Sequence, residues 1–220
     1  MIQSQHRRYN ALTGDWVSVS PQRTQRPWQG QSEKPAPPGA PYDPACYLCP
    51  GNERANGEHN PAYRSTHVFT NDFAAFLPDL PPSALENEHA LLREEQVFGT
   101  CRVLCFSPRH DLTLAQMSPD QIRGVIDLWA CQAQELGETY RWVQIFENKG
   151  QIMGCSNPHP HGQVWASSAL PREAQKELEQ QREWNREHRT ILLVEYAELE
   201  RVREERVVLE TEHWLALVPW

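Results

Sequence analysis

The sequence SNPHPHGQVWA, residues 156–166, places His159 and His161 two positions apart with a proline between them. Proline restricts its own backbone and biases the preceding residue toward extended geometry, so we expect this segment to be a strand. Side chains at i and i+2 of a strand point to the same face, so His159, His161 and Gln163 should project together. Gly162 lacks a Cβ, and we expect a ligand to approach the backbone closely there. The stretch therefore predicts a strand that presents two imidazoles and a carboxamide to one ligand.

The residues before this stretch supply groups that suit an anion. Gly150, Gly154 and Ser156 bring backbone amides and a hydroxyl, and such amides can form a concavity that binds phosphate. An imidazole that faces a phosphate can act as an acid, a base or a nucleophile. Gln163 is neutral and only forms hydrogen bonds, whereas a histidine at that position would titrate and help to activate water. The pattern favours group transfer over hydrolysis, with two structural histidines, or two histidines on a metal, as the alternatives.

A second motif, CYLCPGN, spaces Cys46 and Cys49 as C-x-x-C. A redox C-x-x-C usually opens a helix, where the dipole lowers a thiol pKa, but the Pro-Gly pair that follows here favours a knuckle turn. A structural zinc site would need two further ligands. Spacing alone does not choose among the histidines, and two buried structural thiols are the alternative. The histidine candidates are His59, His67, His89, His110, His159 and His161.

The apolar pattern predicts one clear helix and several strands. Residues 118–140 begin with Ser118 as N-cap and Gln121 as its capping-box partner. The charged residues 171–206 should be helical, with a break near Thr190. This order of elements argues for an α+β fold with a largely antiparallel sheet flanked by helices. The first helix should bury Ile122, Val125, Ile126, Trp129, Ala133 and Leu136, and strands are expected at 14–20, 66–76, 99–110, 142–150, 156–168, 206–210 and 213–220.

Charge and composition argue against several classes of protein. The formal net charge of −8 disfavours a role in nonspecific nucleic-acid binding. No apolar run approaches the roughly 18 residues of a membrane span, and the first ten residues lack an apolar signal core. We therefore expect a cytoplasmic protein without a membrane or nucleic-acid partner. Its six cysteines should then be thiols or metal ligands.

The segment at about residues 20–45 is rich in proline and carries Arg23 and Arg26. Such a segment is too rigid and polar to form a regular element. It is either an ordered surface connection, which its composition alone favours, or an arm that reaches a partner or an anionic ligand.

Together, these motifs resemble those of galactose-1-phosphate uridylyltransferases, a family of the histidine-triad superfamily. The resemblance rests on GCSNPHPHGQVWA, CYLCPGN, VFTNDFAA, CFSPRH, WVQIFENKG and ETEHWLALVP, and on the start RRYNALTGDWVSVSPQRTQRPWQG, and it covers essentially all 220 residues. It implies a histidine-triad-like fold and a homodimeric enzyme of galactose metabolism. The implied reaction exchanges UDP-glucose and galactose 1-phosphate for glucose 1-phosphate and UDP-galactose through a covalent uridylyl-histidine.

The resemblance also implies roles for individual residues. His161 is similar to the nucleophile that becomes uridylylated, and Gln163 and Ser156 are similar to contacts of the phosphoryl oxygens. The zinc ligands that it implies are Cys46, Cys49, His110 and His159.

Other implied roles concern the substrates and the partner subunit. Arg23 and Arg26 resemble arms that reach the partner's site, which reverses the preference for a plain surface connection. Glu177 resembles one ligand of a second metal site of the iron type. The remaining contacts of the uridine, the ribose and the phosphates would be Ala55, Asn71, Asp72, Asn148, Gly154 and Cys155.

The resemblance has one large departure. Members of the family continue well past residue 220 into a second half, which carries further ligands for the site of Glu177 and several hexose-phosphate contacts. We therefore expect residues 1–220 to form one N-terminal histidine-triad-like domain with a truncated C-terminus. The alternatives are a nucleotide phosphorylase or adenylyl-transferring relative that uses the same histidine, and a zinc-stabilised nucleotide-binding fragment without turnover.

Overall fold

The computed structural model describes residues 4–27, 30, 39–79, 89–155 and 157–220. The chain divides into two units, one formed by residues 34–170 and the other by residues 1–33 with 171–220. Within the described residues, no helix combines the length and the apolar character that crossing a membrane requires. All six cysteines are described and none forms a disulfide.

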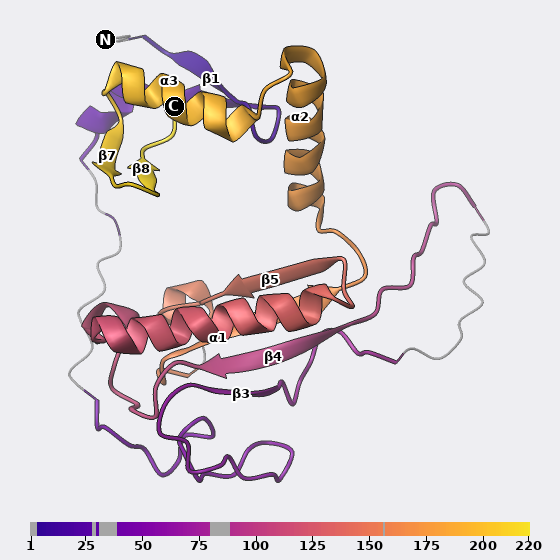
Figure 1. The fold of residues 1–220 in the computed structure, drawn as a ribbon, viewed down its shortest axis with the longest axis vertical. Coiled ribbons are helices and arrows are strands. Elements are labelled where there is room, and N and C mark those ends of the chain that lie inside the picture. Colours follow the sequence, from indigo (N-terminus) through magenta and orange to yellow (C-terminus); the bar gives the residue numbers. More distant parts are fainter. Residues whose placement is uncertain (1–3, 28–29, 31–38, 80–88, 156) are drawn as a thin grey trace. The chain divides into compact units, whose positions relative to one another are not determined.

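The unit of residues 34–170 contains a four-stranded antiparallel sheet (Figure 1). Its strands lie side by side in the order β3, β4, β6, β5. The register places His161 opposite Cys105 and Gln163 opposite Val103. Directly opposite residues of an antiparallel pair share a face of the sheet, so these four side chains lie on one face. The strands are β3 His67–Thr70, β4 Gly99–Cys105, β5 Trp142–Phe146 and β6 His161–Ser167.

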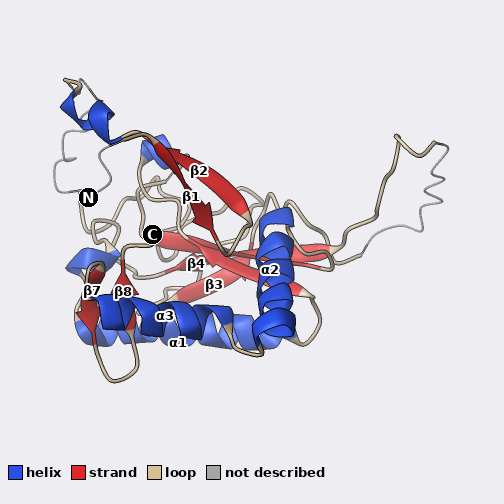
Figure 2. Ribbon diagram, turned by 90° about the horizontal axis from the view of Figure 1, so that it is seen from above, coloured by secondary structure: helices blue, strands red, loops and turns tan. Residues whose placement is uncertain are grey.

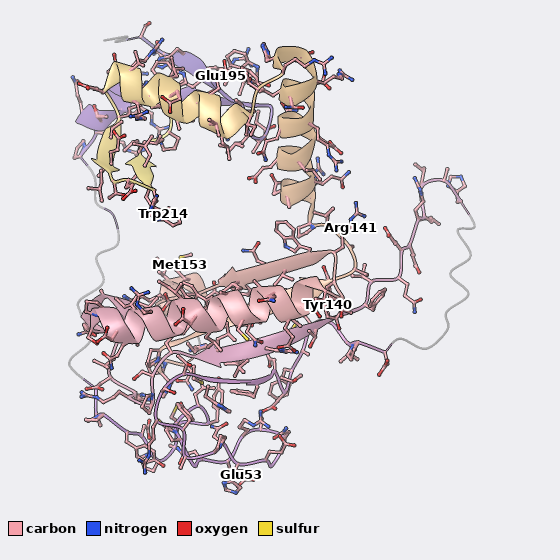
Figure 3. The ribbon with its side chains drawn as sticks, in the orientation of Figure 1. Glu53, Tyr140, Arg141, Met153, Glu195 and Trp214 are labelled. Atoms are coloured by element: carbon pink, nitrogen blue, oxygen red, sulfur yellow. The ribbon has the colours of Figure 1, made fainter. Side chains whose placement is uncertain are left out.

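Helix α1, Pro119–Gly137, begins with the capping box that the sequence predicts. The Gln121 N–H donates to Ser118 Oγ at 3.3 Å, and the Ser118 N–H donates to Gln121 Oε1 at 2.9 Å. These two bonds satisfy backbone groups that have no partner in the first turn. After the helix ends, Tyr140 and Arg141 lie in the connection to β5 (Figure 3).

The buried stripe of α1 differs from the predicted one. Val125 and Leu136 are buried as expected, but Ile126 is 51% exposed and Ala133 is also exposed. The place expected for Ala133 is taken by Gln132, which is buried because Arg102 Nη1 donates to its Oε1 at 2.7 Å. A buried polar group with a partner is tolerated in a core, and a pattern of apolar residues does not reveal it.

The two faces of the sheet carry different clusters. The face under α1 holds the main apolar core, and the opposite face packs against the loop that contains the C-x-x-C motif. His161 therefore lies on the loop side, because its strand partner Cys105 belongs to that second cluster. The main core comprises Leu104, Phe106, Met117, Val125, Leu136, Val164 and Ala166, and the second cluster comprises Cys46, Leu48, Cys49, Val103 and Cys105.

The other unit combines two hairpins with two helices that meet at a corner (Figure 2). The chain turns between the helices at Arg189, whose φ of 60° is left-handed, so the break predicted near Thr190 is confirmed. Strand β1 was not predicted, because its sequence HRRYN shows no alternation of apolar and polar residues. It is a strand because it pairs with β2. The elements are β1 His6–Asn10, β2 Asp15–Val19, α2 Arg172–His188, α3 Leu192–Arg203, β7 Val207–Glu210 and β8 Leu215–Leu217.

A buried carboxylate holds the end of this unit together. The Glu200 side chain is 1% exposed and pairs with Arg206 at 2.9 Å. The hydrogen bond from Arg206 lowers the pKa of Glu200 below its usual value. The Trp220 ring lies near the guanidinium carbons of Arg8, at 4.3 Å, and Arg206, at 4.8 Å. These cation–π contacts join the first strand to the last residues of the chain.

Candidate active site and metal centre

The C-x-x-C motif forms the knuckle turn that the sequence predicts. The Cys49 N–H donates to the Cys46 carbonyl at 3.1 Å, and the Leu48 N–H points to Cys46 Sγ at 3.4 Å. Asn52 donates from its side-chain amide to the Cys46 carbonyl at 2.8 Å. Gly51 adopts a φ of 78°, which turns the chain directly after the motif and prevents a helix there. Both thiols are buried and belong to one short loop.

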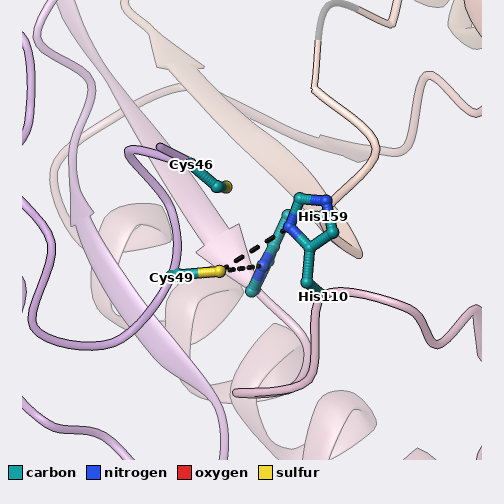
Figure 4. A group of neighbouring side chains, drawn as sticks. All are labelled: Cys46, Cys49, His110 and His159. Carbon is teal, nitrogen blue, oxygen red and sulfur yellow. Dashed lines mark hydrogen bonds between the residues drawn. The ribbon is translucent and has the colours of Figure 1, made fainter. Parts of the chain in front are cut away.

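Two imidazoles complete the group around these thiols (Figure 4). Cys49 Sγ lies 3.6 Å from Nδ1 of His110 and 3.5 Å from Nδ1 of His159. The possible ligand atoms of Cys46, Cys49, His110 and His159 all lie within 4.8 Å of one another. In a tetrahedral site with metal–sulfur bonds of about 2.3 Å and metal–nitrogen bonds of about 2.0–2.1 Å, sulfur and nitrogen are about 3.6 Å apart. The group therefore has the dimensions of a four-coordinate metal site.

The electrostatic setting of the group also suits a cation. Burial raises the pKa of Cys49 to about 11 and lowers the pKa of His159 to about 4. Without a cation, the buried thiol thus stays protonated and the buried imidazole stays neutral. A metal ion would favour the thiolate and would use the lone pair of the neutral imidazole.

The second nitrogen of His159 decides which tautomer is present. His159 Nε2 lies 2.9 Å from the carbonyl oxygen of Ser107, which can only accept a hydrogen bond. Nε2 therefore carries the proton, and the lone pair of Nδ1 faces Cys49. A ligand histidine that donates its other N–H to a carbonyl is typical of protein metal sites.

His161 is held two residues further on by the same segment. Its Nδ1 lies 2.7 Å from the carbonyl oxygen of His159, so Nδ1 donates and the lone pair of the neutral ring is on Nε2. His161, Gln163 and Trp165 are half-buried and alternate with the buried Gly162 and Val164, as expected for one face of a strand. The Trp165 Nε1–H donates to Gln163 Oε1 at 3.1 Å. This bond occupies the oxygen of the Gln163 amide and leaves its nitrogen as the donor end.

The role expected for Gly162 is wrong. A Cβ at this position would lie 2.8 Å from Phe106 Cζ and 2.9 Å from the carbonyl oxygen of Phe146. Gly162 therefore points away from His161, toward the core under α1, and its missing side chain makes room for neighbouring protein atoms. Close packing within the sheet, and not access for a ligand, requires glycine here.

Several substrate contacts implied by the family lie in the same unit. Asn71 continues the pairing of β3 with β4, since its N–H donates to the Cys101 carbonyl at 2.9 Å. Asp72 follows, and its side chain is 9% exposed with Arg54 Nη1 at 3.6 Å. Ala55 is next to Arg54 in the chain, and Asn148 follows β5.

The glycine-rich segment before the histidines is partly described. Gly150 and Gly154 have left-handed φ values of 86° and 80°, which favour glycine. The Cys155 thiol donates to the Asn157 carbonyl at 3.0 Å. Ser156 lies outside the described residues.

Three implied site residues belong to the other unit. Arg23 lies in the 3-10 helix Pro21–Gln25 and Arg26 caps it. Glu177 is exposed on α2, and within the described residues it belongs to no group of three or more His, Cys, Asp or Glu side chains that could hold a metal.

Two residues near the metal group were missed in the sequence. Asn157 accepts the His159 N–H at 2.9 Å and also lies 3.4 Å from Cys46 Sγ through its Nδ2. Tyr63 contacts both the knuckle and His159. Asn157 could have been identified, because it belongs to the stretch of residues 156–166 that contains the histidine pair. Tyr63 lies in a loop whose sequence has no motif that would indicate a role for it.

Known proteins resemble this chain both in sequence and in fold. Residues 1–171 match the family described as galactose-1-phosphate uridyl transferase, N-terminal domain. The galactose-1-phosphate uridylyltransferase of Haemophilus influenzae is 52% identical over 216 residues, which are 98% of this chain and 62% of the relative. The enzyme of the same name from Rattus norvegicus is 52% identical over 217 residues, which are 98% of this chain and 57% of the relative. The chain thus spans about three fifths of the length of these curated relatives.

Solved structures show the same fold. A structure of a uridylyltransferase has a TM-score of 0.68 at 25% identity and covers 98% of this chain and 62% of its own. An ADP-glucose phosphorylase from Arabidopsis thaliana, with bound ADP-glucose, has a TM-score of 0.66 at 21% identity, with coverages of 98% and 64%. The expected histidine-triad-like α+β fold is therefore confirmed. Because the family's N-terminal domain matches more than three quarters of the residues and carries the metal group and the histidine pair, this chain belongs to the galactose-1-phosphate uridyl transferase family.

Proposed function

We propose that the chain transfers a uridylyl group between UDP-glucose and galactose 1-phosphate, with His161 as the nucleophile. The observation that carries this proposal is the 2.7 Å hydrogen bond from His161 Nδ1 to the His159 carbonyl. It orients the ring and leaves the lone pair on Nε2, the nitrogen that must attack phosphorus. Membership of the family supplies the reaction and its substrates as the hypothesis to test.

The proposed reaction has two matching steps. In the first, the Nε2 lone pair of His161 attacks the α-phosphorus of UDP-glucose, the bond from that phosphorus to the bridging oxygen breaks, and glucose 1-phosphate leaves with both electrons. In the second, a phosphate oxygen of galactose 1-phosphate attacks the same phosphorus and the nitrogen–phosphorus bond breaks, which gives UDP-galactose and restores the imidazole. Gln163 would donate from its amide nitrogen to the phosphoryl oxygens in both steps. Its inability to titrate keeps it from assisting water.

We propose zinc as the metal held by Cys46, Cys49, His110 and His159. Two sulfur and two nitrogen donors at these distances suit zinc, and four protein ligands leave no open position, so the ion would supply folding energy and rigidity. The ligand His159 also accepts the hydrogen bond of His161. Rigidity at the metal would thus hold the nucleophile in place.

Three finer parts of the proposal concern the whole protein. We propose a cytoplasmic homodimer in which Arg23 and Arg26 reach the partner's substrate, and a second, iron-type site that includes Glu177. What supports them is the family to which the chain belongs.

The test is to incubate the chain with uridine-labelled UDP-glucose and to measure the intact mass and the label after denaturation. We expect a uridylyl adduct in the wild-type chain and in His213→Ala, whose side chain is 75% exposed, but none in His161→Ala. An adduct that survives in His161→Ala would refute the assignment. In a parallel incubation with labelled ADP-glucose, faster labelling than by UDP-glucose would favour an adenylyl-transferring relative. Binding of nucleotide without any adduct would favour a nucleotide-binding module.

A further inference from the structure

Tyr63 contacts both the knuckle of the C-x-x-C motif and the ligand candidate His159. Its hydroxyl oxygen is 2.6 Å from the Leu48 carbonyl, inside the knuckle, and 3.1 Å from Nε2 of His159. Its ring stacks on His67, with centroids 4.9 Å apart and an interplanar angle of 19°. In sequence, these hydrogen-bond partners are 15 and 96 residues away from Tyr63. One side chain therefore joins the loop that carries the thiols to the segment that carries the histidine pair.

The single hydroxyl proton gives this contact a direction. The Leu48 carbonyl can only accept, so the phenol donates its proton there. Toward His159 the phenol oxygen must then accept, which requires a proton on Nε2. Tyr63 and the Ser107 carbonyl thus both accept from the same N–H, and both favour the tautomer whose Nδ1 lone pair faces Cys49.

We infer that Tyr63 is a positioning residue for the metal site and, through His159, for the nucleophile His161. The inference rests on the proposed function, because it concerns the same metal group and the same histidine. The hydroxyl sets the protonation and direction of one ligand while it anchors the loop of two others. The His159 carbonyl accepts the 2.7 Å hydrogen bond from His161, so the position of His159 also sets the orientation of the His161 ring.

The test compares Tyr63→Phe with Tyr47→Phe in the 220-residue chain. Phenylalanine keeps the ring that packs on His67 and removes only the hydroxyl. Tyr47 lies between the two cysteines of the C-x-x-C motif, but it is 43% exposed and does not belong to the group of Cys46, Cys49, His110 and His159. Zinc affinity is measured by competition with a chromophoric chelator, and the ligand geometry is read from the absorption spectrum of the cobalt(II)-substituted protein. Near-UV circular dichroism confirms that each variant is folded.

We expect zinc affinity to fall about tenfold in Tyr63→Phe, the lower end of the range for partners of metal ligands, because the Ser107 carbonyl remains. The cobalt spectrum should shift in this variant, and adduct formation by the zinc-saturated form should slow. Tyr47→Phe should match the wild type in affinity and spectrum. Equal affinities and spectra in all three proteins, or equal losses in both variants, would overturn the inference. A wild-type chain that binds no zinc would instead refute the metal site itself, and the inference with it.

Discussion

Replacement of Gly162 by alanine should destabilise the unit of residues 34–170 although it adds only one methyl group. The new Cβ would lie 2.8 Å from Phe106 Cζ, 3.2 Å from Phe106 Cε1 and 2.9 Å from the Phe146 carbonyl oxygen. Carbon atoms normally approach to about 3.5–4.0 Å, so the ring must move by about 0.7 Å or more. Phe106 is 3% exposed and packs edge-on against Trp129, with centroids 5.8 Å apart. The ring therefore has little room to move.

Overpacking of this kind costs about 1–3 kcal/mol. For a domain of this size each kcal/mol lowers the melting temperature by about 2–4 °C, so we expect a fall of about 2–12 °C in differential scanning calorimetry. The adduct yield should also fall, because His161 is the adjacent residue in the strand. Gly124→Ala in α1 is the matched control.

The control should have the opposite sign. Among the described residues, a Cβ at Gly124 would meet no atom within 4 Å apart from its chain neighbours and the backbone of its own helix. Alanine is also favoured over glycine inside a helix by about 0.5–1 kcal/mol. Gly124→Ala should therefore melt slightly above the wild type. A Gly162→Ala variant that melts at or above the wild-type temperature would refute the packing argument.

Chelation, or Cys49→Ala, should release about one zinc per chain and lower both the melting temperature and the adduct yield, and full stability without metal would contradict the site. Gln163→His should hydrolyse the adduct faster relative to transfer, because an imidazole can help to activate water, whereas equal adduct lifetimes would contradict this role. The hydrogen bond with Arg206 is the main reason why the pKa of Glu200 is lowered in the folded state. The ionised Glu200 therefore stabilises the fold above its usual pKa of 4.5, and this stabilisation is lost as the pH falls through the lower pKa of the folded state. In thermal melts, the melting temperature of Glu200→Gln should be below that of the wild type at neutral pH and should converge with it in acid. Glu198 is exposed on the same helix, so the melting temperature of Glu198→Gln should follow that of the wild type at every pH. If the melting temperature of Glu200→Gln also stays parallel to that of the wild type, this would contradict the ion pair.

Much of the local structure could be predicted from short stretches of sequence. The start of α1 follows from Ser118 and Gln121, whose reciprocal hydrogen bonds span only three residues. The knuckle at Cys46 and Cys49 follows from the Pro-Gly pair after the motif, and the strand after Pro160 follows from alternation. In each case the atoms that decide the geometry are within a few residues of one another, so the backbone alone brings them together.

The partners of Cys49 were decided by tertiary structure. His110 and His159 are 61 and 110 residues away from it in the sequence. Spacing alone did not distinguish them from the other four histidines that were candidate metal ligands. The resemblance to a known family named the right pair, but the residues by themselves did not. The two imidazoles meet the thiols because His110 follows β4 and His159 precedes β6, and these two strands pair.

Packing decided the remaining features. Gly162 is glycine because Phe106 and a neighbouring strand occupy the space of its Cβ, and Gln132 is buried because Arg102 reaches it from β4. Tyr63 gains its place only where the knuckle and the histidine segment come together. The sequence by itself determined the helices, most strands and the knuckle turn at Cys46 and Cys49. The strand order and register determined which side chains meet, because atoms distant along the chain come into contact only after the sheet has formed.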